Sequence, residues 1–240
     1  MNVIITMAGE GRRFREAGFA VPKHRIEVRG KSLLAWSLES LRSFYQHSFI
    51  FVSRREYIAR SEIEQSCRTL GIAKYEHLEL PEPTDGQATS ALLARPAIED
   101  AEAPILIYNI DTYVEPWALQ PEMIKGDGWI PAFSAAGDHW SFVTFDPAFK
   151  VTAITEKIRI SEFATVGLYF FGSFNLYEEC YRQCRFEGYR EKFVAPLYQR
   201  LIEDPCREVY TTVLAPAAVH VLGTPEDIRN WAPEFHSSRT

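Results

Sequence analysis

The sequence predicts one α/β domain, built on a mixed, mainly parallel β-sheet flanked by helices. Three observations support this fold class. In residues 1–111, short apolar runs alternate with amphipathic stretches, which is the pattern of parallel strands joined by helical crossovers. In residues 112–231, strand-like segments follow one another before helices return, which favours mixed strand directions. The chain has 240 residues, and no repeat or flexible linker divides it, so we expect a single domain over residues 1–240.

The first half alternates strands with helices. Apolar runs predict buried strands at residues 3–5, 49–52, 75–80 and 105–108. A helix over residues 32–45 is indicated by leucines with helical spacing, and a second begins near Ser61, which forms a capping box with Glu64. A third helix spans residues 86–95, with Asp85 as its N-cap, and Pro96 ends it.

The second half is richer in strands. Strands are expected at residues 129–133, 141–145, 151–155, 165–171, 209–214 and 219–222. Helices are expected at residues 174–184, 190–202 and 225–231. Aromatic residues crowd the region from Tyr169 to Tyr189; they could form a core or the face of a homo-oligomer, and we favour the core.

Composition excludes several classes of protein. Hydrophobic residues make up 46% and charged residues 24% of the chain, which excludes a disordered protein. A net charge of −6 argues against nonspecific binding to nucleic acid, and no apolar run reaches the roughly 20 residues of a membrane span. Without a basic leader or a Cys-x-x-Cys pair, we expect a cytoplasmic protein with reduced thiols. The spacing of Cys180 and Cys184 favours a core face over a zinc site.

A glycine-rich turn follows the first strand. Gly9 and Gly11 would let backbone N–H groups approach a phosphate, although the turn matches neither the dinucleotide fingerprint nor the P-loop. Residues 9–31 also hold seven basic residues against three acidic ones. This segment is either a solvated loop or a cradle in which fixed cations neutralise a triphosphate.

The same segment resembles a known family. Gly9-x-Gly11-x-Arg13-Phe14, then Pro22-Lys23 and Gly30-Lys31, is similar to the N-terminal signature of nucleotidyltransferases that activate sugar phosphates and related phosphates. The run from Met7 to Lys23 resembles a subgroup linked to capsule and surface-polysaccharide biosynthesis, some of whose members are cytidylyltransferases. The resemblance implies a GT-A-like nucleotide-diphospho-sugar transferase fold. It also implies that Ala8, Gly9 and Gly11 bind the nucleotide, while Arg13 and Lys23 contact the triphosphate.

Two later segments continue the resemblance on the nucleotide side. Gly86, Gln87 and Ala88 are similar to the family's Gly-x-Ala segment, which packs against the nucleobase. Asn109-Ile110-Asp111 follows the most apolar strand, where a carboxylate points into the ligand crevice of an open α/β sheet. Mg²⁺ usually takes one or two such carboxylates plus substrate phosphates, so Asp111 is the expected magnesium ligand; the alternative is a turn-capping Asp.

The acceptor side follows in the second half. Glu156-Lys157, then Val166-Gly167-Leu168-Tyr169, resembles the family's acceptor-binding region. The resemblance implies that Lys157 binds the phosphate or carboxylate of the acceptor and that Glu156 binds its hydroxyl groups or an amine. Gly167 would leave room for the acceptor beside the sheet. Asn109 is a further expected substrate contact. A surface ion pair and a strand bulge are the plainer alternative.

The chain departs from the family pattern in three places. The family's common Pro-Lys-Pro reads Pro22-Lys23-His24 here. Val221 stands where many members carry a second metal-binding Asp. Leu80-Pro81 stands where many members have a Gln that reads the base.

The resulting expectation is an enzyme with a nucleotide-binding half, residues 1–111, and an acceptor-binding half, residues 112–231. It would couple a nucleoside triphosphate, with CTP favoured, to a sugar phosphate or another small phosphorylated metabolite and release pyrophosphate with Mg²⁺. The alternatives are a glycosyltransferase that consumes a nucleotide sugar and a binding protein of this fold without turnover.

Overall fold

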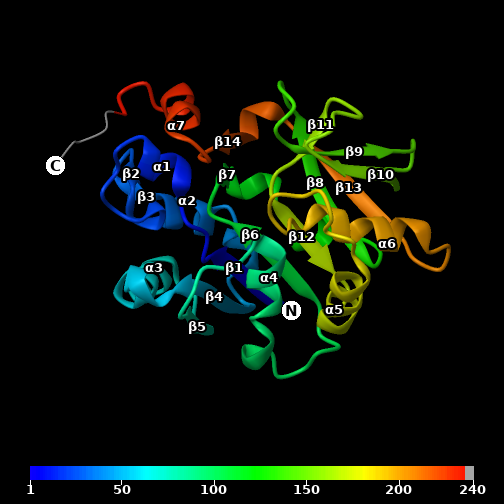
Figure 1. The fold of residues 1–240 in the computed structure, drawn as a ribbon, viewed down its shortest axis with the longest axis horizontal. Helices are drawn as coiled ribbons and strands as arrows, with labels where there is room; N and C mark the ends of the chain where they lie inside the picture. Colours follow the sequence, from blue (N-terminus) through cyan, green and yellow to red (C-terminus); the bar gives the residue numbers. More distant parts are fainter. Residues whose placement is uncertain (236–240) are drawn as a thin grey trace.

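A ten-stranded sheet forms the centre of the molecule in the computed structural model, which describes residues 1–235 (Figure 1). Its strands lie in the order β10-β9-β11-β8-β12-β6-β1-β4-β5, and β13 pairs with β8. These strands are β1 (Asn2–Met7), β4 (Ser48–Arg54), β5 (Tyr75–Leu80), β6 (Ile105–Asn109), β8 (Gly128–Ser134), β9 (Ser141–Phe145), β10 (Val151–Glu156), β11 (Phe163–Thr165), β12 (Leu168–Phe171) and β13 (Val209–Leu214). Two small sheets pair β2 (Glu27–Val28) with β3 (Lys31–Ser32), and β7 (Thr112–Val114) with β14 (Val219–Val221).

Helices cover both faces of the sheet. They are α1 (Arg12–Glu16), α2 (Leu33–Glu39), α3 (Arg60–Leu70), α4 (Gln87–Leu92), α5 (Phe174–Gln183), α6 (Tyr198–Glu203) and α7 (Pro225–Trp231). Val3 and Ile5 of β1 belong to a core cluster with α2 and α3, whereas Ile4 belongs to one with α4, α5 and α6. Because both faces are buried, the inner strands read as continuous apolar runs.

The strand order places the ends of β1 and β6 at a reversal of the chain path. β5, β4, β1 and β6 are all parallel, and the chain moves outward from β1 to β5 before it returns to β6 on the other side of β1. In open α/β sheets, ligands bind in the crevice at the carboxyl ends of strands where the order reverses. β6 then pairs antiparallel with β12, which joins the two halves of the sheet.

The structure confirms the expected fold class and corrects two elements of the second half. The strand expected over residues 165–171 is divided into β11 and β12, because Gly167 interrupts it at a φ of 80°. The helix expected over residues 190–202 starts as a 3-10 turn at Ala195, followed by α6. Pro196 explains the late start, because its ring and missing N–H restrict proline to the first turn of a helix.

Two expected helix caps are also wrong. Helix α3 begins at Arg60, so Ser61 lies inside it, and the Ser61 hydroxyl donates to Glu62. Helix α4 has Gly86 as its N-cap, and the carboxylate of Asp85 instead accepts hydrogen bonds from Lys192 and Thr89.

Most of the crowded aromatic residues belong to the core, as favoured. Tyr169, Phe170, Phe171 and Tyr177 are buried, while Tyr189 is exposed. Cys180 is also buried, in the same cluster as α5 and α6. Within residues 1–235, none of the helices combines the length and the apolar character that crossing a membrane would require.

Candidate active site

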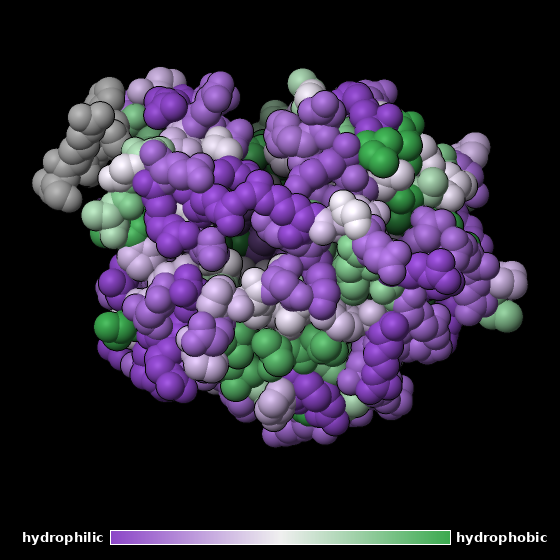
Figure 2. All heavy atoms as spheres, viewed as in Figure 1, coloured by the Kyte–Doolittle hydropathy of each residue, from purple (hydrophilic) through white to green (hydrophobic). Residues whose placement is uncertain are grey.

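A cleft of about 640 Å³ opens where β1 and β6 end. Figure 2 shows a hollow near the middle of one face of the molecule, surrounded mostly by hydrophilic residues. The cleft is lined by twelve of the residues that the sequence singled out: Ala8, Gly9, Gly11, Arg13, Lys23, Gly86, Gln87, Asn109, Asp111, Glu156, Lys157 and Gly167. Ala88 does not line it: this residue is fully buried, and its carbonyl accepts a hydrogen bond of 2.5 Å from the Tyr177 hydroxyl.

Lys23 and Asp111 form an ion pair in this cleft. Lys23 Nζ lies 2.7 Å from Asp111 Oδ1 and 5.2 Å from the centre of the Phe14 ring. Phe14 is the buried residue of the short helix α1, whose N-cap, Gly11, has a φ of 61° that favours glycine. Burial lowers the pKa of Lys23, although the charge of Asp111 opposes this shift. The lysine is thus a largely desolvated cation beside the glycine-rich loop.

Two further charged side chains, Arg13 and Asp227, lie with Asp111 around Gly223. A methyl group on Gly223 would lie 3.6 Å from Arg13 Nη1, 3.6 Å from Asp227 Oδ2 and 3.8 Å from Asp111 Oδ2. Asp227 belongs to the first turn of α7, where its N–H donates to the hydroxyl of Thr224, the N-cap of this helix. The same side chain also brings a second carboxylate to the cleft. Val221, which stands where an Asp was expected from the family pattern, lines the cleft as well.

The basic cluster of residues 9–31 does not act as one cradle. Only Arg12, Arg13 and Lys23 among its seven basic residues line the cleft. The others form ion pairs elsewhere: Arg15 with Glu10, Arg25 with Glu62, Arg29 with Glu234, and Lys31 with Glu39. Local charge density in the sequence therefore overstated the number of cations available to a triphosphate.

Glu156 and Lys157 reach the cleft from the end of β10. The Glu156 carboxylate is buried and accepts a hydrogen bond from Ser141, and burial raises its pKa although that bond opposes the shift. Lys157 has a φ of 56°, and its N–H donates to the Trp140 carbonyl at 2.8 Å. Lys157 Nζ lies 4.2 Å from the centre of the Phe193 ring. The two neighbouring residues thus present a buried carboxyl group and an exposed cation to the same space.

The space beside Gly167 is occupied by the Asn109 side chain. A Cβ atom at Gly167 would collide with the Asn109 side-chain amide. Asn109 Oδ1 accepts a hydrogen bond of 3.1 Å from the backbone N–H of Asp111. Asn109 therefore orients the turn that carries Asp111. The missing side chain at Gly167 leaves the space that Asn109 needs for this contact.

Sequence reasoning missed several residues of the cleft. Tyr57 lines it from the turn after β4, and the Tyr57 hydroxyl donates to the Gly9 carbonyl at 2.7 Å. Arg190, Glu191 and Phe193 also line the cleft, from the segment wrongly expected to be helical. The residues around Tyr57 form no motif, so only the fold reveals its contact with the glycine-rich loop.

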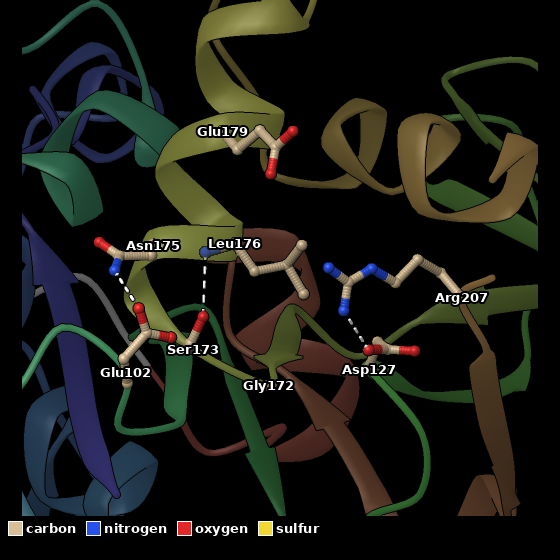
Figure 3. Close-up of a pocket in the computed structure, with 8 residues that line it drawn as sticks. All are labelled: Glu102, Asp127, Gly172, Ser173, Asn175, Leu176, Glu179 and Arg207. Carbon is tan, nitrogen blue, oxygen red and sulfur yellow. Dashed lines mark hydrogen bonds and ion pairs between the residues drawn. The ribbon is translucent and has the colours of Figure 1, made fainter.

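A separate cavity of about 420 Å³ lies near the start of α5 (Figure 3). Its polar groups satisfy one another: Arg207 pairs with Asp127 at 2.7 Å, and Asn175 Nδ2 donates to Glu102 at 2.5 Å. None of the residues predicted for the site lines this cavity. We therefore assign the candidate active site to the larger cleft.

The donor set of the cleft suits a magnesium ion. Within residues 1–235, no group of three or more metal-ligating side chains gathers. Mg²⁺ does not need one, because it is usually bound by one or two carboxylates, water and substrate phosphates. Asp111 and Asp227 supply two such carboxylates beside Gly223.

Comparisons with known proteins agree on one fold. No protein-family model and no curated protein sequence matches the chain, but many solved structures do. A nucleoside-diphosphate-sugar pyrophosphorylase from Vibrio cholerae RC9 has a TM-score of 0.87 and 29% identity, covering 98% of this chain and 100% of its own. An inositol-1-phosphate CTP transferase from T. maritima has a TM-score of 0.76 and 18% identity, with 94% and 90% coverage. A putative glucose-1-phosphate thymidylyltransferase from Bacillus anthracis has a TM-score of 0.75 and 12% identity, with 98% and 96% coverage.

The fold is that of the nucleotidyltransferase structures with which the chain is compared. The expectation of an enzyme of this class is confirmed by the similarity to the Vibrio cholerae pyrophosphorylase, which extends over nearly the whole chain.

Proposed function

We propose that this protein transfers a nucleotidyl group from a nucleoside triphosphate to a small phosphorylated acceptor. An oxygen of the acceptor phosphate attacks the α-phosphorus, a new P–O bond forms, and the bond to pyrophosphate breaks. The observation that carries the proposal is the ion pair between the largely buried Lys23 and the partly exposed Asp111, in the cleft that the glycine-rich loop and the exposed Lys157 also line. Such transfer depends on positioning and on charge neutralisation, and needs no covalent nucleophile from the protein.

Each side chain has a role in this proposal. The N–H groups of residues 9–11 and the guanidinium of Arg13 bind the triphosphate, and Lys23 stabilises the charge that develops as pyrophosphate leaves. Asp111, with Asp227 beside it, would hold Mg²⁺, which when bound neutralises phosphate charge. Lys157 binds the acceptor's phosphate, and Glu156 binds its hydroxyl or amine groups.

The nucleotide and the acceptor are narrower proposals. CTP is favoured by the resemblance of residues 7–23 to capsule-associated cytidylyltransferases, and one structural neighbour is described as a CTP transferase. Others are described as a thymidylyltransferase and a UDP-glucose pyrophosphorylase. A sugar phosphate or inositol-like phosphate suits the cleft volume of about 640 Å³, and a cytoplasmic role in surface-polysaccharide synthesis follows from the same resemblance.

A pyrophosphate-release screen tests the proposal. Four ribonucleoside triphosphates and dTTP are each combined with a panel of sugar phosphates, inositol phosphate and phosphocholine in the presence of Mg²⁺. We expect one pair to support turnover, and Lys23→Met or Asp111→Asn to lower kcat by about 10²- to 10³-fold. Lys125→Met and Glu122→Gln, which alter exposed charges away from the cleft, should leave kcat unchanged.

Other results would favour the alternatives. Release of nucleotide from a nucleotide sugar, without use of any triphosphate, would indicate a glycosyltransferase. Triphosphate binding that persists in Asp111→Ala, without turnover in the wild type, would indicate a binding protein.

A further inference from the structure

The segment around Gly86 and the loop before α6 are joined through their backbones. The Lys192 N–H donates to the Asp85 carbonyl at 2.8 Å, and the Ala88 N–H donates to the Lys192 carbonyl at 2.9 Å. These two hydrogen bonds lie on either side of Gly86. They connect the first half of the chain to the second at the rim of the cleft, because Gly86 and Gln87 line it.

Gly86 is a glycine because of this contact. Its φ of 151° is rare for other residues, and a Cβ atom there would lie only 2.5 Å from Lys192 N and 2.7 Å from Lys192 C. The sequence suggested that this glycine makes room for a flat nucleobase. The structure shows that the backbone of Lys192 occupies the space beside it.

Side chains add to the backbone contact between Lys192 and residues 85–88. Lys192 Nζ lies 2.7 Å from Asp85 Oδ2 and donates to the Tyr181 hydroxyl at 3.2 Å. Thr89 Oγ1 donates to Asp85 and lies 2.9 Å from the Tyr181 hydroxyl. We call the five residues Asp85, Gly86, Thr89, Tyr181 and Lys192 the Lys192 clasp. The hydrogen bonds that Lys192 donates to Asp85 and Tyr181 raise the pKa of Lys192, so the ammonium is charged at neutral pH.

The loop that the clasp holds also supports the acceptor side. Arg190, Glu191 and Phe193 line the cleft, and the Phe193 ring lies under the ammonium of Lys157 at 4.2 Å. Adjacent residues of one loop thus contact the nucleotide side, through Lys192, and the acceptor side, through Phe193.

We propose that Lys192 is a positioning residue that couples the nucleotide-binding and acceptor-binding sides of the cleft. Fixing residue 192 on Asp85 holds the loop, and the loop in turn sets the position of Phe193 beneath Lys157. This role rests on the proposed function, because it presupposes that a nucleotide and an acceptor occupy the two sides together.

Lys192→Met tests the clasp, because it removes the ammonium and keeps the backbone contacts and much of the side-chain length. With the best substrate pair from the screen, we expect the KM values of both the nucleotide and the acceptor to rise about three- to tenfold. Asp85→Asn should act in the same direction, and Lys192→Arg should restore most of the loss. A purely structural role would instead reduce the melting temperature and the active fraction, and leave both KM values unchanged.

Lys150→Met is the matched control. Lys150 forms a similar half-exposed pair with Glu208 at 3.1 Å and does not line the cleft. Its loss should leave both KM values unchanged. In a double-mutant cycle, Phe193→Ala should raise the acceptor KM less in the Lys192→Met background than in the wild type, whereas Lys150→Met and Phe193→Ala should act independently.

Hydrogen exchange measures the same contact without substrate. Residues 87–92 and 190–194 should both exchange faster in Lys192→Met than in the wild type, and not in Lys150→Met. Unchanged exchange in both segments, or unchanged KM values in a variant that turns over, would overturn the coupling. A wild type that releases no pyrophosphate with any pair refutes the proposed function itself, so the wild-type rate distinguishes the two failures.

Discussion

The cleft is assembled from single residues that lie far apart in the sequence. Lys23 follows the glycine-rich loop, Asp111 follows β6, and Lys157 follows β10, yet all three line one space. Two further residues belong to the same region of the fold. Tyr57 holds the Gly9 carbonyl, and His24, next to Lys23, lies buried at the edge of the cleft.

Tyr57→Phe should weaken nucleotide binding. The variant loses the hydroxyl that fixes Gly9, a bond worth about 0.5–1.5 kcal/mol, so we expect the KM for the nucleotide to rise about two- to tenfold with kcat largely retained. Tyr75→Phe is the control, because that hydroxyl makes no hydrogen bond within residues 1–235 and lies outside the cleft. An equal KM in Tyr57→Phe and the wild type would contradict the role of the hydroxyl.

The buried His24 should make stability depend on pH. Burial, assisted by the charge of Arg25, lowers the pKa of His24 to about 4, although Glu62 opposes the shift and His77 adds to it. The unfolded chain binds this proton near pH 6.5 and the folded chain near pH 4, so stability is full above pH 6.5 and falls as the pH drops toward 4.

His24→Gln should therefore flatten the pH dependence. Between pH 7.5 and 5.0 the wild type should lose about 2 kcal/mol more unfolding free energy than this variant, measured by urea denaturation at each pH. His47 and His77 also have lowered pKa values, but they contribute to both proteins and cancel. Parallel curves for the two proteins would show that His24 does not remain neutral when folded.

At the scale of elements, strands and helices with a clear periodicity were predicted more accurately than loops. The bounds expected for β5, β9, β13 and α7 agree with the structure, because each has a clear apolar pattern and a turn or cap at its ends. The segment with Arg190, Glu191 and Phe193, expected to be helical, is a loop, because Pro196 confines the helix to the residues that follow it. Short strands such as β2, β3 and β7 carry too few residues to show a period, and only their pairing with a partner strand defines them.

The break between β11 and β12 gives a test of one element. Gly167→Ala places a side chain at a φ of 80° and displaces Asn109, so we expect a loss of about 1–2 kcal/mol of unfolding free energy and a reduced kcat. Gly71→Ala is matched in backbone strain, with a φ of 78°, but its Cβ atom would meet nothing within 4 Å. Urea denaturation should show a loss in both variants, and pyrophosphate release should fall only in Gly167→Ala.

At the scale of the whole molecule, the motif order predicted one site from both halves of the chain, and the sheet explains how. Strands β6 and β12 pair along residues 105–108 and 168–171, so neither half has a complete sheet alone. The two large core clusters also contain residues from both halves. The sequence could not reveal this pairing, because strand order depends on contacts between distant segments.

Unfolding should therefore be cooperative over the entire chain. Tryptophan fluorescence and far-ultraviolet circular dichroism should give coincident urea transitions. A fragment of residues 1–111 should lack native sheet, because the free side of β6 is uncovered in it. Two separate transitions, or a folded fragment, would show that the halves are independent domains.

The pairing of β6 with β12 also has a consequence during translation. Roughly 60 residues are made between the end of β6 and that of β12, which takes about 3–12 s at ribosomal rates of 5–20 residues per second. Throughout this interval the nascent chain carries the apolar strand β6 with one edge open, and such edges promote aggregation. The yield of this protein in a cell will therefore depend on the speed of the ribosome and on the chaperones that shield the strand until its partner emerges.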